Sequence, residues 1–156
     1  GIGKIGDLFA GRGLSQSIPT TDNRMGMAAI FTTLGQISSG LIMANLVDFD
    51  MVYGHRLDVE GFAGALVEVD HWLTQLLPRL KTDDLLVITA DHGCDPTTPG
   101  TDHTREYVPL LVYSPALSNT KNLGIRDSFA DLGATLAENF GLECLTGKSF
   151  LPVLGD

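Results

Sequence analysis

The stretch that decides the fold is LLVITADHGCDPTTPGTDHTREYVPLLVY, residues 85–113. Two apolar runs, Leu85–Ala90 and Val108–Tyr113, enclose a polar loop that is rich in aspartate and histidine. Neither run alternates between polar and apolar residues, a pattern typical of strands that are buried on both faces. The stretch therefore predicts two buried strands, with metal-binding side chains directly after the first of them.

A second acidic and histidine-containing set follows an earlier apolar run, 41–47, which also predicts a buried strand. This set consists of Asp48, Asp50 and His55. Because ligands bind beyond the carboxyl ends of strands in α/β sheets, the two sets are expected to share one site. Mixed carboxylate and imidazole ligands suit Mn²⁺, Zn²⁺ or Fe. The simpler alternative is that these residues are helix caps or ordinary surface groups.

Three long helices are expected around these strands. Thr21 or Asp22 can cap a helix that runs to about residue 37, and Asp58 opens a longer one that ends near residue 81. Val59, Leu66 and Leu76 belong to the expected buried stripe of that second helix. The last helix is expected over 127–139. The order of elements predicts an α/β fold, a layered and mostly parallel sheet flanked by helices.

Composition narrows the class of protein. The 156 residues fit one domain, and 44% hydrophobic content argues against disorder. A net charge of −9 argues against a nucleic-acid partner, and no apolar stretch is long enough for a membrane span. The two cysteines, Cys94 and Cys144, fit a reduced setting, so a cytoplasmic location is expected. The chain begins at Gly1 within an apolar–glycine pattern, which suggests the interior of a longer protein or a trimmed piece.

Three segments carry a resemblance to a known family: GIGKIGDLFAG (1–11), NLVDFDMVYGHR (45–56) and ITADHGCDPTTPGTDHTREYVPLLVYSP (88–115). They resemble the C-terminal part of the phosphopentomutase family, which belongs to the alkaline phosphatase superfamily. The resemblance implies an isomerase that interconverts ribose 1-phosphate and ribose 5-phosphate, and their deoxy forms. It also implies a phosphothreonine intermediate and two Mn²⁺ ions.

The resemblance assigns roles to particular residues. Five residues would bind metal: Asp50, His55 and His103 the first Mn²⁺, and Asp91 with His92 the second. Lys4 is similar to a lysine near the substrate phosphate. Asp48 would either belong to the metal-binding acids or orient a ligand histidine. The same two alternatives apply to Asp95 and Asp102. Arg56 and Arg105 match the family segments, where they would contact phosphate or pair with aspartates. Cys94 stands where asparagine is expected more often, either as an inert buried thiol or as an adventitious ligand.

The resemblance also implies features that residues 1–156 lack: an N-terminal strand with another ligand aspartate, the threonine nucleophile and a cap domain. We therefore expect residues 1–156 to be the C-terminal part of the metal-binding core domain, with no catalytic nucleophile and no mutase activity alone. At most one well-formed metal site is expected, and an uncovered sheet edge would favour self-association. The alternatives are another enzyme of the superfamily (a phosphoglycerate mutase or a phosphatase), a non-catalytic metal-binding domain, or an α/β domain without a site.

Overall fold

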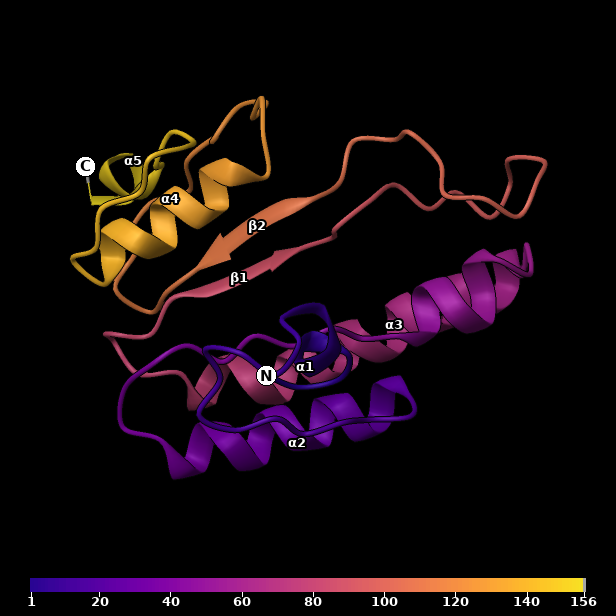
Figure 1. Cartoon of the computed structure of the whole chain (residues 1–156), viewed down its shortest axis with the longest axis horizontal. Helices are drawn as coiled ribbons and strands as arrows, with labels where there is room; N and C mark the ends of the chain where they lie inside the picture. Colours follow the sequence, from indigo (N-terminus) through magenta and orange to yellow (C-terminus); the bar gives the residue numbers. More distant parts are fainter. Residues whose placement is uncertain (156) are drawn as a thin grey trace. The chain divides into compact units, whose positions relative to one another are not determined.

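The computed structural model describes residues 1–155, which form two compact units. The first unit contains residues 1–79 and 92–107, and the second contains residues 80–91 and the chain from Val108 onward. The α-helices and the strands of both units are labelled in Figure 1. The chain leaves the first unit after Arg79 and returns to it for the histidine-containing loop. That loop therefore belongs to the same unit as Asp50.

The first unit is helical, and its two long helices begin at the expected caps. The helix α2 (Asn23–Gln36) follows Asp22, whose carboxylate accepts a hydrogen bond from Met25 N at 2.7 Å. Asp58 accepts one from Gly61 N at 2.9 Å at the start of α3 (Val59–Leu76). Both caps satisfy an amide that has no partner within the helix, so these two predictions are confirmed. The unit also contains α1 (Ile5–Leu8), the π-helix η1 (Phe49–Gly54) and the 3₁₀ turn η2 (Leu77–Arg79).

The prediction of a strand over 41–47 is wrong. Within that range only Ala44 forms a bridge, which is parallel and pairs with Ile2. Ile2 is 1% exposed and makes a second parallel bridge with Ile18. Consecutive pairing is what defines a strand, and here Ile2 N donates to Met43 O while Asn45 N donates to Ile2 O without further rungs. The apolar run is therefore an irregular segment that leads to η1.

The second unit contains the paired strands among the described residues. The strands β1 (Leu86–Thr89) and β2 (Leu110–Tyr113) pair antiparallel, with Leu86 opposite Tyr113. Both strands were expected, but the expectation that they are buried is wrong, because no residue of either strand is buried. The mostly parallel layered sheet is not confirmed, because parallel pairing among residues 1–155 is limited to the isolated bridges of Ile2. The helix α4 (Ala130–Asn139) agrees with the third expected helix, and α5 (Leu151–Gly155) follows it.

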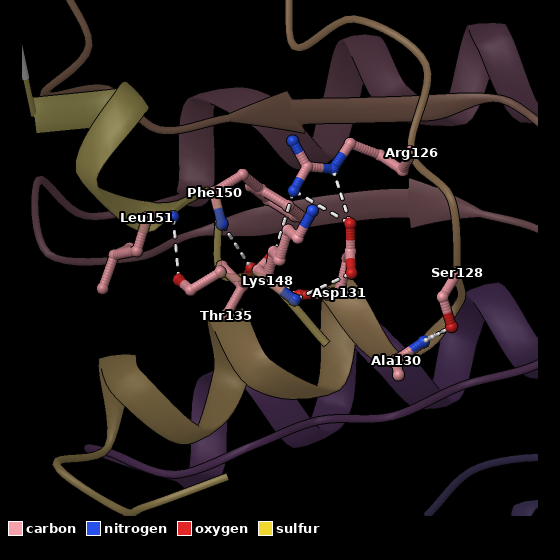
Figure 2. Close-up of polar contacts among 9 residues, drawn as sticks. Arg126, Ser128, Ala130, Asp131, Thr135, Lys148, Phe150 and Leu151 are labelled. Atoms are coloured by element: carbon pink, nitrogen blue, oxygen red, sulfur yellow. Dashed lines mark hydrogen bonds and ion pairs between the residues drawn. The ribbon is translucent and has the colours of Figure 1, made fainter. Parts of the chain in front are cut away.

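A buried polar network fastens the C-terminal segment to α4 (Figure 2). Asp131 is 5% exposed and binds Lys148 N at 2.8 Å and Arg126 Nε at 2.9 Å. One turn later, the Thr135 hydroxyl donates to Asp131 O and accepts from Phe150 N at 2.9 Å. The Lys148 amide, and then Arg126, lower the pKa of Asp131 against the opposing effect of burial. Phe150, fully buried, is thus held by a hydrogen bond as well as by packing.

The expected buried stripe of α3 is only partly present. Leu76 is 1% exposed, but Val59 and Leu66 are 45% and 53% exposed, so for those two residues the expectation is wrong. Helical spacing identifies the face of a helix that is apolar, but a neighbouring segment must cover that face to bury it. Within residues 1–155, no helix is both long and apolar enough to cross a membrane.

Candidate metal centre

Asp50 and His55 are brought together by a π-turn. They lie at the two ends of η1, where His55 N donates to Asp50 O at 3.0 Å across five residues. This wider turn places His55 Nε2 3.2 Å from Asp50 Oδ1. Isolated π-turns are uncommon and are frequent at functional sites. No feature of the sequence predicted this turn, although the residue types predicted that Asp50 and His55 would share a site.

Two further histidines reach the same carboxylate from the loop that follows β1. His103 Nε2 lies 3.3 Å from Asp50 Oδ1. The His92 ring stacks on the His103 ring with centroids 3.7 Å apart and an interplanar angle of 16°. Asp50, His92 and His103 each offer one ligand atom within 4.8 Å of the others. Three of the four histidines of the chain therefore surround a single aspartate.

Backbone carbonyls orient two of these rings. His55 Nδ1 is hydrogen-bonded to Thr101 O, and His92 Nδ1 lies 3.0 Å from Gly93 O. A carbonyl can only accept, so each contact requires the proton on Nδ1. The Nε2 lone pair of each neutral ring is then available to a metal ion, an arrangement that metal-binding histidines commonly use.

The donor set fits a divalent metal ion. Asp50 Oδ1 is buried and has no hydrogen bond, although two imidazole nitrogens lie within 3.3 Å of it. A buried carboxylate oxygen without a hydrogen bond is costly unless a cation compensates it. One carboxylate with several imidazoles is the ligand set of transition metals such as Mn²⁺, Zn²⁺ or Fe, and calcium prefers oxygen ligands alone. The cluster therefore has the composition and the spacing of a metal site.

The other assigned residues belong to the first unit, except Asp91, which belongs to the second. Lys4 is exposed at the start of α1, and its backbone amide donates to Asn45 Oδ1 at 2.8 Å, which joins the GIGK segment to the segment that leads to Asp50. Asp91 follows β1 and belongs to the second unit, whereas His92 belongs to the first. Pairing of Asp91 with His92 on a second ion stays a prediction. Arg56, Asp102 and Arg105 are exposed.

Asp48 pairs with a residue that sequence reasoning missed. Its carboxylate accepts from Asn23 N at 2.8 Å, and its own amide donates to Asn23 Oδ1 at 2.9 Å. Asn23 is 4% exposed, so this reciprocal pair is shielded from water. It ties the first turn of α2 to the residue that precedes η1. Through these contacts Asp48 holds the backbone next to Asp50. The only feature of the sequence that could have indicated the pair is the asparagine at the first position of α2.

Cys94 packs tightly against the π-turn. A Cβ added to Gly54 would overlap Cys94 Sγ and would lie 2.9 Å from Phe49 O, so only glycine allows this approach. Burial raises the pKa of Cys94, and the charges of Asp50, Glu106 and Asp95 raise it further. The thiol therefore stays protonated at neutral pH, which favours the inert role over that of a thiolate ligand.

Comparison with known proteins places the chain in a class. A model of the metalloenzyme superfamily matches residues 11–144, and the chain belongs to that superfamily. Its curated relatives include the phosphopentomutases of Syntrophotalea carbinolica (59% identical over 97% of this chain), Caldanaerobacter subterraneus subsp. tengcongensis (56% over 96%) and Dictyoglomus thermophilum (54% over 99%). The resemblance to phosphopentomutase expected from the sequence is thus confirmed. The chain spans 38–40% of the length of these relatives.

Proposed function

We propose that this chain is part of a phosphopentomutase, an isomerase that interconverts ribose 1-phosphate and ribose 5-phosphate and their deoxy forms. The observation that supports this most is 59% identity to a phosphopentomutase over 97% of the chain. The Asp50 cluster agrees with it, because phosphoryl transfer between sugar hydroxyls requires cations at the phosphate. The activity is proposed for the whole protein, in which an enzyme-bound phosphothreonine would carry the phosphoryl group.

In this proposal Asp50, His55 and His103 hold one Mn²⁺ ion, and Asp91 and His92 hold the other. His92 offers a ligand atom within 4.8 Å of those of Asp50 and His103, so the two ligand sets would adjoin at this histidine. When bound, the ions would neutralise phosphate charge and lower the barrier to in-line transfer. The carbonyls of Thr101 and Gly93 bind Nδ1 of His55 and His92, which would leave Nε2 of both rings to act as metal ligands. Lys4 would contribute a positive charge to the binding of the substrate phosphate.

Three further expectations belong to the same proposal. The 156 residues alone would have no mutase activity, because the proposed threonine nucleophile is not among them. The chain would associate with itself through its strand edges, where Leu111 and Tyr113 are 59% and 40% exposed. The protein would act in the cytoplasm, without nucleic-acid or membrane partners.

A turnover assay on the whole protein tests the proposed activity. Ribose 1-phosphate would be supplied with Mn²⁺ and formation of ribose 5-phosphate measured for the wild type, His103→Ala and His71→Ala. His71 is the remaining histidine of the chain and lies exposed on α3, so His71→Ala is the matched control. We expect His103→Ala to lose at least about 100-fold in turnover, since removal of a metal ligand abolishes charge stabilisation. His71→Ala should be near wild type.

Two other functions are distinguishable in the same experiment. Turnover of a phosphoglycerate or hydrolysis of a simple phosphate ester, without mutase activity on pentose phosphates, would identify another enzyme of the superfamily. Metal binding without turnover of any phosphate ester would indicate a non-catalytic metal-binding domain. Either result would overturn the proposed function.

A further inference from the structure

His92 and His103 directly precede two residues that pair with each other across the base of a loop. Gly93 and Thr104 form an isolated antiparallel bridge, in which Thr104 N donates to Gly93 O at 3.2 Å. The same Gly93 carbonyl receives His92 Nδ1 at 3.0 Å. Gly93 is buried, and a Cβ there would lie 2.5 Å from Thr104 O and 2.8 Å from Glu106 N. The two segments therefore approach as closely as glycine permits.

The Thr104 side chain closes the loop a second time. Its hydroxyl accepts a hydrogen bond from Asp95 N at 2.7 Å, one step beyond the backbone pair. Thr104 is half-buried, whereas His103 and Arg105 on either side are exposed. A single residue thus contributes both links between the two sides of the loop base.

Asp95 stabilises the far side of this closure. Its Oδ1 accepts from Thr97 N at 2.8 Å and from Thr97 Oγ1 at 2.7 Å, and its Oδ2 accepts from Thr98 Oγ1 at 2.8 Å. Thr98 N also donates to Asp95 O. These bonds fix a tight turn and direct the Asp95 carboxylate into the loop. The bonds of its side chain therefore orient the Asp95 amide, which donates to the Thr104 hydroxyl.

His103 depends on this closure more than the other histidines do. Within residues 1–155, His55 and His92 each have a carbonyl that fixes Nδ1. The contacts of the His103 ring are to Asp50 Oδ1 and to the rings of His55 and His92. Its side chain is 50% exposed and has no carbonyl partner among residues 1–155, so its placement also relies on its backbone, which is fixed at Thr104. A freely moving loop would have to lose conformational entropy each time His103 met a metal ion.

We propose that Thr104 is a positioning residue: its hydroxyl, bound to Asp95 N, holds the loop closed so that His103 meets Asp50 and His92 in a geometry ready for metal. This inference rests on the proposed metal site. It assigns the affinity of that site partly to a side chain that touches neither metal nor substrate. Removal of the hydroxyl would leave every ligand in place and would weaken binding through the cost of ordering the loop.

The test compares Thr104→Val with Thr104→Ser in the whole protein, together with any residues that flank these 156. Valine keeps the shape and removes the acceptor, whereas serine keeps the acceptor. Mn²⁺ affinity would be measured by calorimetry and ligand geometry by the visible spectrum of the Co²⁺-loaded protein. We expect Thr104→Val to weaken affinity ~10–100-fold, the range for partners that orient metal ligands. Thr104→Ser should restore affinity to within about threefold of the wild type, a near-complete recovery of the orienting bond.

Thr74→Val is the matched control, because the exposed Thr74 hydroxyl donates to His71 O on α3, outside the loop, and should leave metal affinity unchanged. Melting temperatures with and without Mn²⁺ separate a structural role from positioning. A structural role lowers the melting temperature of the metal-free protein, whereas positioning reduces the increase caused by metal. If Thr104→Val does not fold, the experiment uses Thr104→Ala instead, which removes the same hydroxyl.

The outcomes distinguish this inference from the proposed function. A wild-type protein that binds no Mn²⁺ or Co²⁺ would refute the metal site and the inference together. A wild type that binds metal, with Thr104→Val or Thr104→Ala equal to it in affinity and in Co²⁺ spectrum, would refute the role of Thr104 alone.

Discussion

Replacement of Thr135 by valine should loosen the C-terminal segment from α4. The hydroxyl is fully buried, donates to Asp131 O at 2.7 Å and accepts from Phe150 N at 2.9 Å. Valine preserves the shape and removes both bonds. The carbonyl of Asp131 remains in the hydrogen-bond ladder of α4, but the buried Phe150 amide loses its acceptor. An unsatisfied buried amide costs about 1–3 kcal/mol.

The expected change is large enough to measure. A loss of about 2 kcal/mol corresponds to a decrease of about 4–8 °C in melting temperature for a chain of this size. Amide hydrogen exchange gives the local readout, because the protection of Phe150 N should fall in Thr135→Val before that of the α2 amides. Circular dichroism would follow the melting of the wild type and of Thr135→Val.

Thr32→Val is the control for this change. The Thr32 hydroxyl also donates to the carbonyl four residues earlier, Ala28 O at 3.0 Å, but it is exposed. A bond of this kind on an exposed helix face contributes little, so Thr32→Val should change the melting temperature by no more than about 1–2 °C. Equal stabilities of Thr135→Val and Thr32→Val, with unchanged protection of Phe150 N, would refute the role of the buried bond.

Three other predictions follow from particular contacts. Gly54→Ala should lower both stability and metal affinity, because its Cβ would overlap Cys94 Sγ and displace the π-turn; unchanged thermal unfolding and Mn²⁺ titration would contradict this. The pKa of Asp131 is lowered in the folded state, so its stabilisation is present above its unfolded value of about 3.9 and is lost as pH falls through the folded pKa. Asp131→Asn should therefore weaken this acid dependence in unfolding experiments between pH 6 and pH 2, and parallel curves for the two proteins would refute it. Burial and nearby carboxylates raise the pKa of Cys94, so iodoacetamide at pH 8 should modify the exposed Cys144 first; mass spectrometry showing faster labelling of Cys94 would contradict that order.

The elements that could be predicted from the sequence are those with local causes. Asp22 and Asp58 predict the starts of α2 and α3, because each caps the first turn of its helix through its own side chain. The prediction of a strand over the apolar run 41–47 was wrong because a strand also needs a neighbouring strand to pair with, which composition does not reveal. The pairing of this run is limited to one bridge with Ile2. The direction in which two strands pair also depends on tertiary structure. β1 and β2 pair antiparallel across the long loop that joins them.

The candidate site was predictable in its members but not in its geometry. The residue types and the family resemblance selected Asp50, His55, His92 and His103. The π-turn, the stacking of His92 on His103 and the closure by Thr104 depend on contacts across nine or more residues or on an unusual turn. The Asn23–Asp48 pair was missed for the same reason, since its partners are 25 residues apart.

Metal content tests the central claim most directly. The whole protein, its His103→Ala variant and its His71→Ala variant would be loaded with Mn²⁺, dialysed and analysed by mass spectrometry of the bound metal. The carboxylate–imidazole cluster predicts that the wild type and His71→Ala retain metal in stoichiometric amounts and that His103→Ala loses at least one ion per chain. Equal metal content in all three proteins would contradict a metal site at Asp50 and His103.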